Sequence, residues 1–229
     1  MTTVYIISAP SGSGKSTLVA GVRPLVSGLD FSVSYTTRPP RKVERNGRDY
    51  TFVPRAEFEE MVRRDEFLEH ADVFGNYYGT SKHFLREAVE SGHDLLLDID
   101  VQGAEQIKRK LPQAVGIFLL PPNRQELEHR LRARSQDAEE VIQRRLATAT
   151  REIENYSKYD YILVNDRLDE SVAALRSILL AERLRRSEAQ RTADDIELLA
   201  TAERYRLKNM RDRLTPILAS FAPAVPGGR

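Results

Sequence analysis

A short run near the start of the chain, from Ser8 to Thr17, combines glycines, small hydroxyl residues and one lysine. Its sequence, SAPSGSGKST, fits the phosphate-binding pattern GxxxxGK[ST], except that Ala9 stands in the place of the first glycine. Gly12 and Gly14 allow backbone conformations that turn successive N–H groups toward one anion. A helix after the loop adds the positive end of its dipole, so the run predicts a site for the phosphates of a nucleoside triphosphate.

The predicted roles within this loop follow from the chemistry of its side chains. Lys15 is the predicted catalytic cation at the β and γ phosphates, and the Ser16 hydroxyl is a ligand type that Mg²⁺ accepts. The alternative, a glycine-rich turn with a chance lysine, would need neither a strand before the loop nor a helix after it. The predicted triphosphate-binding residues are Ala9, Pro10, Ser11, Gly12, Ser13, Gly14, Lys15, Ser16 and Thr17.

A carboxylate for the same metal ion is expected at the end of a neighbouring strand. Leu95–Ile99 is an apolar run that contains Asp98 at its tip, and Asp100 points to the same side by strand alternation. Ser16 and Asp98 are therefore the predicted metal ligands. Asp100 has a structural alternative, as the N-cap of the following helix, and the sequence leaves open which aspartate lies nearer to the metal.

Four short apolar runs are predicted to be buried strands, and a stretch of helical character follows each of them. This alternation is typical of an α/β fold in which helices flank a central parallel sheet. The phosphate-binding loop lies between the first run and a helix predicted over residues 15–26, which is the context such a loop requires. The runs are Val4–Ser8, Leu95–Ile99, Val115–Leu120 and Tyr161–Val164.

Two excursions interrupt this alternation, and one more helix completes it. The first, between residues 30 and 74, is polar and strand-rich: strands are predicted at Phe31–Tyr35 and Arg48–Val53, and a helix at Arg55–Arg64. The second follows a proline pair and contains helices predicted over residues 125–134 and 137–156. A further amphipathic helix is predicted from residue 168 to about 184.

The chain continues beyond that helix as an extension over residues 185–229. Thr192 and Asp195 form a capping-box pattern that opens a helix predicted to run through Leu214 and to end at Pro216. Residues 222–229 read as a loose tail. The extension either packs on the core of its own chain or contributes to a subunit interface in a homo-oligomer, and the sequence leaves both open.

The charge balance excludes partners that require one sign in large excess. The chain of 229 residues carries 35 Lys and Arg against 34 Asp and Glu, a net charge of +1, so neither nucleic acid nor a membrane is expected as a partner. The charges are unevenly spread: residues 38–48 hold five cations against one acid, and residues 55–72 hold three against seven. Without cysteine, a secretory signal or a bilayer-spanning run, the expected location is the cytoplasm.

A GTPase is the first alternative for a phosphate-binding loop of this kind. Asp100–Gly103 fits the DxxG pattern of GTPase switch regions, but the chain has no base-reading NKxD motif, and DxxG alone is common by chance. A kinase acting on a small acceptor must instead hold two anions and exclude water. The arginines of the two excursions suit that task.

Several blocks closely resemble guanylate kinases in sequence, order and spacing. They are SVSYTTRPPR at residues 32–41, NGRDYTF at 46–52, FLE at 67–69, GNYYGT at 75–80, LDIDVQG at 97–103 and ILVND at 162–166. The resemblance covers residues 3–184 and implies an α/β P-loop kinase core at 1–30, 82–122 and 158–184. It also implies an NMP-binding insertion at 31–81 and a helical lid at 123–157. Ala9 is similar to the form that bacterial members carry.

The resemblance implies transfer of the γ-phosphoryl group of MgATP to GMP, giving ADP and GDP, in purine nucleotide metabolism. Glu69 would accept from the N1–H and N2–H₂ donors of guanine, while adenine would leave its charge unpaired. Two guanidinium groups and two phenols suit a phosphate dianion. The implied GMP-binding residues are Ser34, Arg38, Arg41, Tyr50, Glu69, Tyr78, Thr80 and Asp100.

The lid completes the implied site on the ATP side. Arg134 and Arg145 join Lys15 as the predicted catalytic residues, and Arg130 and Asn165 are predicted to bind ATP. Two rivals differ from this reading: a phosphopeptide-binding module would degrade the loop, and a kinase for a ribose phosphate would not need Glu69. The sequence leaves open the preference between GMP and dGMP.

Overall fold

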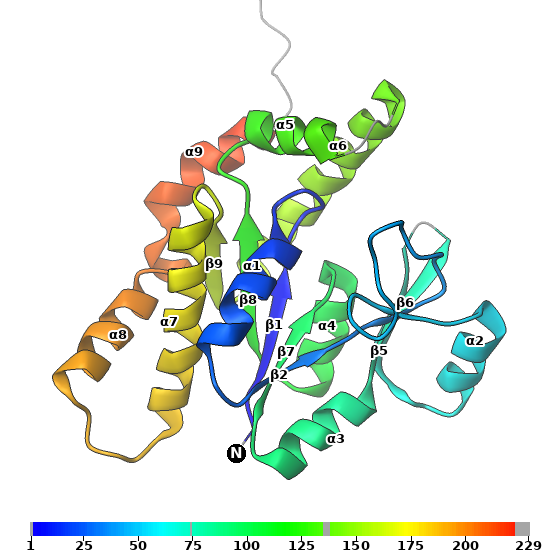
Figure 1. The fold of residues 1–229 in the computed structure, drawn as a ribbon. Coiled ribbons are helices and arrows are strands. Elements are labelled where there is room, and N and C mark those ends of the chain that lie inside the picture. The colour runs from blue at the N-terminus through cyan, green and yellow to red at the C-terminus, as the bar shows by residue number, and fades with distance from the viewer. Residues whose placement is uncertain (1, 74, 135–137, 223–229) are drawn as a thin grey trace, which may run out of the picture. The chain divides into compact units, whose positions relative to one another are not determined.

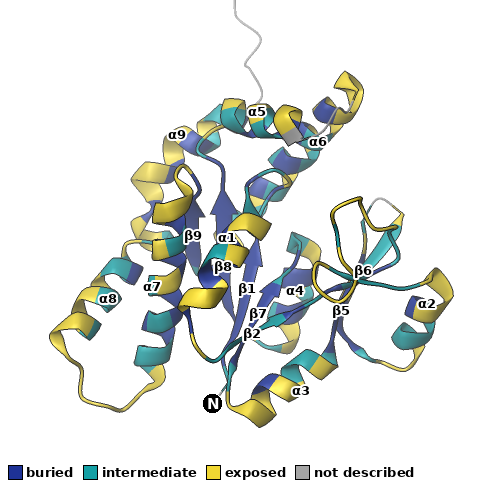
Figure 2. Cartoon of the chain, viewed as in Figure 1, coloured by how far each residue is buried: buried dark blue, intermediate teal, exposed yellow. Residues whose placement is uncertain are grey.

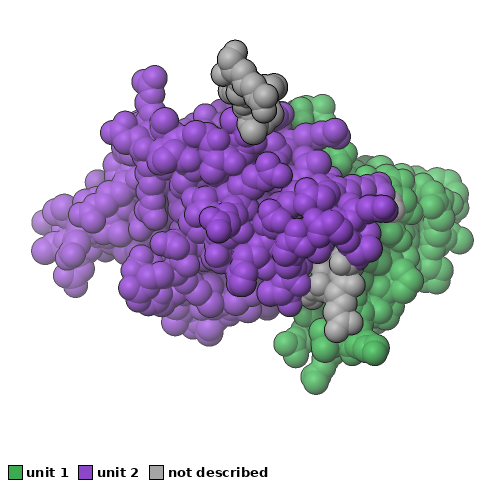
Figure 3. Space-filling view, turned by 90° about the horizontal axis from the view of Figure 1, so that it is seen from above, with its two compact units in different colours: residues 1–8, 26–116 green, residues 9–25, 117–229 purple. Residues whose placement is uncertain are grey.

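The computed structural model describes residues 2–73, 75–134 and 138–222 of the chain (Figure 1). The chain divides into two compact units, which Figure 3 colours separately. Unit 1 comprises residues 1–8 and 26–116, and unit 2 comprises residues 9–25 and 117–229. Among the described residues, no helix is both long and apolar enough to span a bilayer.

The core of unit 1 is a parallel sheet with strand order β2–β7–β1. β1 (Val4–Ser8) and β7 (Asp94–Asp98) are almost entirely buried, and β2 (Leu29–Ser32) pairs with the other side of β7. Helix α3 (Lys82–Ser91) packs on β2 and β7, and α4 (Val101–Lys110) packs on β1. Since β2 and β1 pair with its two edges, β7 is flanked by a strand on either side.

A second, smaller sheet of unit 1 has the strand order β4–β3–β6–β5. β5 (Phe67–Val73) and β6 (Asn76–Ser81) form an antiparallel pair, and the short strands β3 (Tyr35–Thr36) and β4 (Thr51–Phe52) extend it. Helix α2 (Arg55–Arg63) buries Phe58, whose ring stacks on Phe67 with centroids 4.5 Å apart. This aromatic contact fixes α2 on the sheet.

Unit 2 is built around the parallel pair of β8 (Val115–Leu120) and β9 (Tyr161–Val164), whose buried residues are dark blue in Figure 2. Helix α7 (Leu168–Arg186) packs on β9 and on α1 (Lys15–Val22), which continues into the 3₁₀ helix η1 (Arg23–Leu25). The remaining elements are α5 (Arg124–Arg134), α6 (Glu139–Ile153), η2 (Glu154–Lys158), α8 (Ala193–Glu203), η3 (Leu207–Asn209) and α9 (Arg211–Phe221).

The predicted α/β class, with parallel strands flanked by helices, is confirmed. The predicted strand Phe31–Tyr35 is wrong, because the chain changes sheets inside it: Ser32 still pairs with Leu97 of β7, whereas Tyr35 pairs with Gly79 of β6. The division into core, insertion and lid stays a prediction. The predicted start of the second lid helix and nearly all of the predicted tail lie outside the described residues.

The predicted helix through Leu214 is also wrong in its course. Its start is confirmed, since Thr192 and Asp195 form the complete capping box of α8. However, α8 ends at Glu203, and Pro216 does not end a helix but lies inside α9. Proline lacks one backbone N–H and disfavours a helix interior, yet α9 buries Leu214, Ile217 and Phe221 across that position. Burial of this apolar face outweighs the local preference of the proline.

Candidate active site

The phosphate-binding loop of unit 2 leads from the end of β1 into α1. Gly12 and Gly14 have φ angles of 93° and 90°, values that residues with a side chain rarely adopt. Ser13 N donates to Pro10 O at 3.1 Å, and Leu18 N donates to Gly14 O at 3.0 Å, so the loop closes into a tight turn before α1 begins. The amide groups at the start of α1 therefore face the loop, as an anion site requires.

Asn165, directly after β9, is hydrogen-bonded to the backbone of this loop. Its backbone N donates to Leu120 O at 2.8 Å, and its side-chain Nδ2 donates to Ser13 O at 2.7 Å. The side chain is buried, and a Cβ added at Gly14 would collide with its Nδ2. The position predicted for ATP binding thus supports the loop backbone itself.

The other residues predicted to bind ATP or the transferred phosphoryl group lie in the loop and in helices α5 and α6. Arg145 of α6 donates from Nη2 to Ser11 Oγ at 3.1 Å, which brings this predicted catalytic arginine to the loop. Arg130 instead pairs with Glu126, one turn earlier on α5, at 2.7 Å. Arg134 is the last residue of α5, and its side chain lies outside the described part. Ala9 and Lys15 are half-buried, Pro10 is buried, and Ser16 and Thr17 are exposed.

Unit 1 contains a buried carboxylate, Glu69 on β5, only 4% exposed. Thr80, its cross-strand partner on β6, donates from Oγ1 to Glu69 Oε1 at 2.7 Å. A Cβ added at Gly103 would lie 2.5 Å from Oε2, so a glycine is required there to admit the carboxylate. Ser34, also predicted to read the base, is buried in the same unit.

The environment of Glu69 alters its ionisation. Burial raises the pKa of its carboxyl from 4.5 to about 7, and the negative charge of Asp100 adds to the increase. The hydrogen bond from Thr80 acts in the opposite direction and lowers the pKa. At neutral pH this carboxyl therefore exists in both protonation states, and a ligand that donates hydrogen bonds to it favours the ionised one.

A second cluster in unit 1 collects the predicted phosphate-binding residues around Glu44. The Arg38 guanidinium contacts both oxygens of Glu44, at 2.9 and 3.0 Å, and its Nε donates to Tyr78 Oη at 3.2 Å. Arg41, largely exposed, lies 3.9 Å from the same carboxylate. The ring of Tyr50 lies 5.4 Å from Arg38 and 5.9 Å from the ring of Tyr78. These four predicted residues thus lie close together, with an acid between the arginines.

The two aspartates after β7 have different roles. Asp100 is the N-cap of α4: its Oδ1 accepts from Gly103 N at 2.8 Å, so the capping alternative is confirmed for this residue. Its backbone O accepts from Ser8 Oγ at 3.4 Å. Asp98 is the last residue of β7 and is half-buried. Of the two aspartates, only Asp98 belongs to the strand, and it lies at the carboxyl end.

Comparison with known proteins decides the family. The family model described as guanylate kinase matches residues 1–182. The chain belongs to the guanylate kinase family. It is similar to the guanylate kinase of Koribacter versatilis (strain Ellin345), with 58% identity over 225 residues that cover 97% of each chain.

Two further guanylate kinases support this assignment. The protein from Escherichia coli (strain K12) is 51% identical over 195 residues, which cover 84% of this chain and 94% of that protein. The crystal structure of guanylate kinase from Anaplasma phagocytophilum matches with a TM-score of 0.66 and 36% identity, over 79% of this chain and 86% of that one. The predicted P-loop kinase fold is thereby confirmed.

The two side chains predicted to bind Mg²⁺, Ser16 and Asp98, carry the kind of donor atom that this ion prefers. Mg²⁺ is commonly held by one or two protein oxygens together with substrate phosphates and water, rather than by a protein cage. Across the described part of the chain, no group of three or more His, Cys, Asp or Glu could enclose a metal. The hydroxyl of Ser16 in unit 2 and the carboxylate of Asp98 in unit 1 are both of the hard-oxygen type that fits this ion.

Sequence reasoning on this member of the guanylate kinase family missed three features of the site. Glu44 was counted only as one acid in a basic run, yet it pairs with Arg38. Gly103 was considered only as part of a DxxG pattern, yet it makes room for Glu69. Leu131 of α5 approaches the phosphate-binding loop at Gly12. The signal available beforehand was the spacing of Glu44 from Arg38 and Arg41; the two close approaches involve residues distant in sequence.

Proposed function

We propose that the buried Glu69 and the Arg38 cluster of unit 1 bind GMP, and that the phosphate-binding loop of unit 2 binds ATP. As a member of its family, the chain is an ATP-dependent kinase that converts GMP to GDP. The residue roles within that activity are the proposal. The cytoplasm, where both nucleotides are available, is the proposed location.

The observation that carries the guanine assignment is the pair formed by Glu69 and Thr80. An ionised carboxylate accepts two hydrogen bonds, which matches the N1–H and N2–H₂ donors of guanine. The hydroxyl of Ser34 is proposed to donate to O6 of the base. Adenine presents an acceptor at N1, so binding it would leave a buried charge facing a lone pair, a mismatch of several kcal/mol.

The phosphate of GMP is assigned to the cluster of Arg38, Arg41, Tyr50 and Tyr78. Guanidinium groups bind phosphate oxygens through two parallel hydrogen bonds, and phenol groups add single donors. A phosphate bound there shares the guanidinium groups with Glu44, which keeps the arginines in place. Since dGMP carries the same base and phosphate, it is expected to be a second acceptor.

On the donor side, the loop amides and Lys15 are proposed to bind the ATP phosphates. Arg145 donates a hydrogen bond to Ser11 of the loop, and this contact supports the proposal that Arg145 and Arg134 bind the transferred group. Asn165 holds the loop backbone. Ser16 and Asp98 would hold Mg²⁺, which neutralises charge on the β and γ phosphates when bound.

The proposed reaction is an in-line transfer. An oxygen of the GMP phosphate forms a bond to the γ phosphorus, the bond from that phosphorus to the bridging oxygen breaks, and ADP leaves with the electron pair. The attacking oxygen is anionic at neutral pH, so no general base is required. Rate enhancement then depends on alignment and on cationic stabilisation by Lys15, Arg134 and Arg145.

The assignment is tested by ADP release with MgATP and a panel of acceptors: GMP, dGMP, AMP, CMP and UMP. Turnover with GMP and dGMP, and turnover with the other three reduced by orders of magnitude, is expected. Equal turnover on AMP and GMP would overturn the role of Glu69. No turnover on any acceptor, with binding intact, would favour a phosphopeptide-binding module instead.

A further inference from the structure

The C-terminal segment, residues 192–222, lies beyond the part of the chain that the family model matches. Between α8 and α9 it adds backbone pairing to the edge of β9. Ile162 N donates to Tyr205 O at 2.9 Å, and Leu207 N donates to Asp160 O at 3.1 Å, on either side of an antiparallel bridge from Tyr161 to Arg206. The segment is therefore joined to the strand that leads directly into Asn165 and the phosphate-binding loop.

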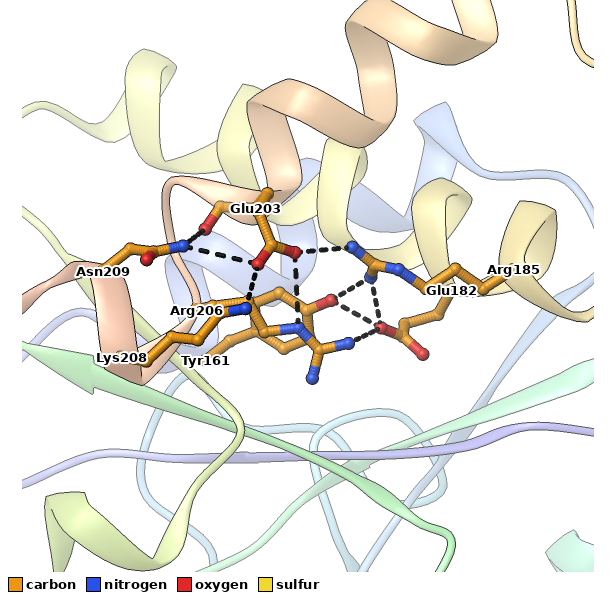
Figure 4. Close-up of polar contacts among 7 residues, drawn as sticks. All are labelled: Tyr161, Glu182, Arg185, Glu203, Arg206, Lys208 and Asn209. Atoms are coloured by element: carbon orange, nitrogen blue, oxygen red, sulfur yellow. Dashed lines mark hydrogen bonds and ion pairs between the residues drawn. The ribbon is translucent and has the colours of Figure 1, made fainter.

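A polar cluster around Glu182 fixes this attachment (Figure 4). Glu182 of α7 is buried, and its Oε1 accepts from Tyr161, Arg185 and, at 2.8 Å, Arg206 Nη2. The Arg206 guanidinium also lies over the Tyr161 ring, 4.3 Å from its centroid. Burial raises the pKa of Tyr161, and the hydrogen bond to Glu182 makes a smaller contribution in the same direction. The C-terminal segment thus supplies one cation to a buried carboxylate.

A second layer of ion pairs extends the cluster into the segment. Glu203, at the end of α8, pairs with Arg185 of α7 at 3.0 Å and with Lys208 of η3 at 2.8 Å. Asn209 donates to the backbone O of Glu203 at 2.7 Å. These contacts connect α7, α8 and η3, and α9 begins two residues after η3 ends.

Helix α9 then packs against α5. Ser220 Oγ accepts from the backbone N of Arg124, the first residue of α5, at 3.1 Å. Asn123 Oδ1 accepts from Glu126 N at 2.8 Å in the ordinary capping manner. The first N–H groups of a helix have no partner within it, so α9 supplies one of the two caps observed at the start of α5.

The opposite end of this chain of contacts is the phosphate-binding loop. A Cβ added at Gly12 would lie 2.9 Å from Leu131 Cδ2 and 3.0 Å from Leu127 Cδ1, so these α5 side chains pack directly on the loop. Helix α5 thus contacts α9 through Ser220 and the loop through two leucines. A shift of α5 would change the surroundings of Gly12.

We propose that α9, anchored through the Glu182 cluster, positions the start of α5 against the phosphate-binding loop, and that Ser220 is a positioning residue for ATP. This inference rests on the proposed function, since ATP affinity is its kinetic readout. Ser220 contacts no substrate; it acts through Arg124 N and the α5 leucines. Loss of its hydroxyl leaves the α5 N-terminus with one cap fewer and loosens the wall of the loop.

The test compares Ser220→Ala, Ser220→Thr and the matched control Ser177→Ala in the full chain. Ser220 donates its hydroxyl to Ile217 O, three residues earlier, and Ser177 likewise donates to a carbonyl within its own helix, Ala173 O of α7. Ser220→Ala is expected to raise the KM for ATP about fivefold, the size of a lost helix cap. The KM for GMP should stay within about twofold, because only one side of the reaction is affected. Ser220→Thr keeps the hydroxyl, so its KM for ATP should stay close to the wild-type value.

Hydrogen exchange without nucleotide provides an independent readout at residues 124–131. Ser220→Ala should exchange faster there than the wild type and Ser177→Ala, and Arg206→Met, which weakens the anchor, should act in the same direction. Unchanged exchange together with an unchanged KM for ATP would overturn the inference, as would equal rises in both KM values. A wild type without turnover on GMP would refute the proposed function instead, and the exchange result would still decide the role of α9.

Discussion

Glu69 combines a chemical task with an unfavourable environment. Its carboxylate is buried between Thr80 and Gly103, and burial holds its pKa near 7. The guanine binding proposed for Glu69 requires the ionised form, because a protonated carboxyl offers a donor where the base also donates. In its proposed role, this one residue couples the choice of base to the pH of the medium.

This coupling predicts a pH dependence of kcat/KM for GMP. With a pKa of about 7, the ionised fraction of Glu69 falls from about one half at pH 7 to about one tenth at pH 6, so kcat/KM should fall about fivefold. The phosphate of GMP titrates with a pKa of about 6 and adds its own decrease. Glu69→Gln removes the first contribution and keeps the second. A variant profile as steep as the wild-type profile would contradict the assignment.

The same carboxyl predicts a change in stability with pH. A folded-state pKa of about 7 lies above the ordinary 4.5, so the folded state binds the proton more tightly. The resulting stabilisation is present below pH 4.5 and is lost as the pH rises through 7. Urea unfolding should show Glu69→Gln gaining stability relative to the wild type between pH 5 and pH 8, by about 2–3 kcal/mol. A constant difference would count against the raised pKa.

The cations of the two proposed nucleotide sites lead to a second prediction about single residues. Lys15→Met should lower kcat by about 10²–10³ by removing transition-state stabilisation. Arg38→Met should lower kcat/KM for GMP by about 10² and leave the KM for ATP nearly unchanged. Lys42→Met and Arg45→Met, at exposed positions of the same basic run, are the matched controls. Thermal unfolding checks that all four variants fold, and wild-type turnover in Lys15→Met would refute the donor site.

At the scale of elements, sequence alone predicted the buried strands best. Val115–Leu120 and Tyr161–Val164 appear with the predicted bounds, because a fully buried strand reads as a continuous apolar run. The pair β5 and β6 was not predicted strand by strand, since both strands mix buried residues with residues that are only partly buried or, in β5, exposed. The split of Phe31–Tyr35 and the course of the chain around Pro216 depend on partners distant in sequence, which no local pattern contains.

The residues of the candidate site also fall into two groups, those found from local motifs and those whose role depends on contacts distant in sequence. The loop, Glu69 and Arg38 were predicted because short motifs carry them. Glu44 and Gly103 act through a salt bridge and a close approach that only the fold creates. A helix cap is only partly predictable from sequence: Asp100 was predicted as a possible N-cap, and the structure shows that it is one.

The phosphate-binding loop predicts the outcome of a glycine substitution. Gly14→Ala combines a φ of 90° with a collision at Asn165 Nδ2, and should raise the KM for ATP by about tenfold or more. Gly92→Ala is the matched control: its φ is 68°, but nothing lies within 4 Å of the added Cβ. That variant should lose about 1 kcal/mol of stability and keep its KM. Similar KM values in the two variants would show that the Asn165 contact is unimportant.

At the scale of the whole molecule, the net charge of +1 conceals strong local pairing. The basic run that contains Arg38 includes its own acid in Glu44, and the C-terminal segment joins the core through acids and bases in alternation. Buried ion pairs are costly to break, because the remaining partner stays desolvated. The Glu182 cluster is therefore expected to govern global stability.

This expectation is tested with Glu182→Ala. Removal of the carboxylate leaves Arg185 and Arg206 without their shared acceptor, and the free energy of unfolding should fall by about 3 kcal/mol. Glu188→Ala, an exposed glutamate shortly after the same helix, should change it by less than about 0.5 kcal/mol. Urea denaturation of both variants measures the difference. Equal effects would show that the cluster carries little of the folding free energy.

The pairing of Tyr205 and Leu207 with β9 has a consequence for the behaviour of the chain in concentrated solution. β9 meets β8 along one side, and on the other the residues around the Arg206 bridge occupy backbone groups of Asp160 and Ile162. An uncovered strand edge invites pairing between copies and, from there, aggregation. By covering this edge, the C-terminal segment is expected to keep β9 from pairing with a strand of another copy.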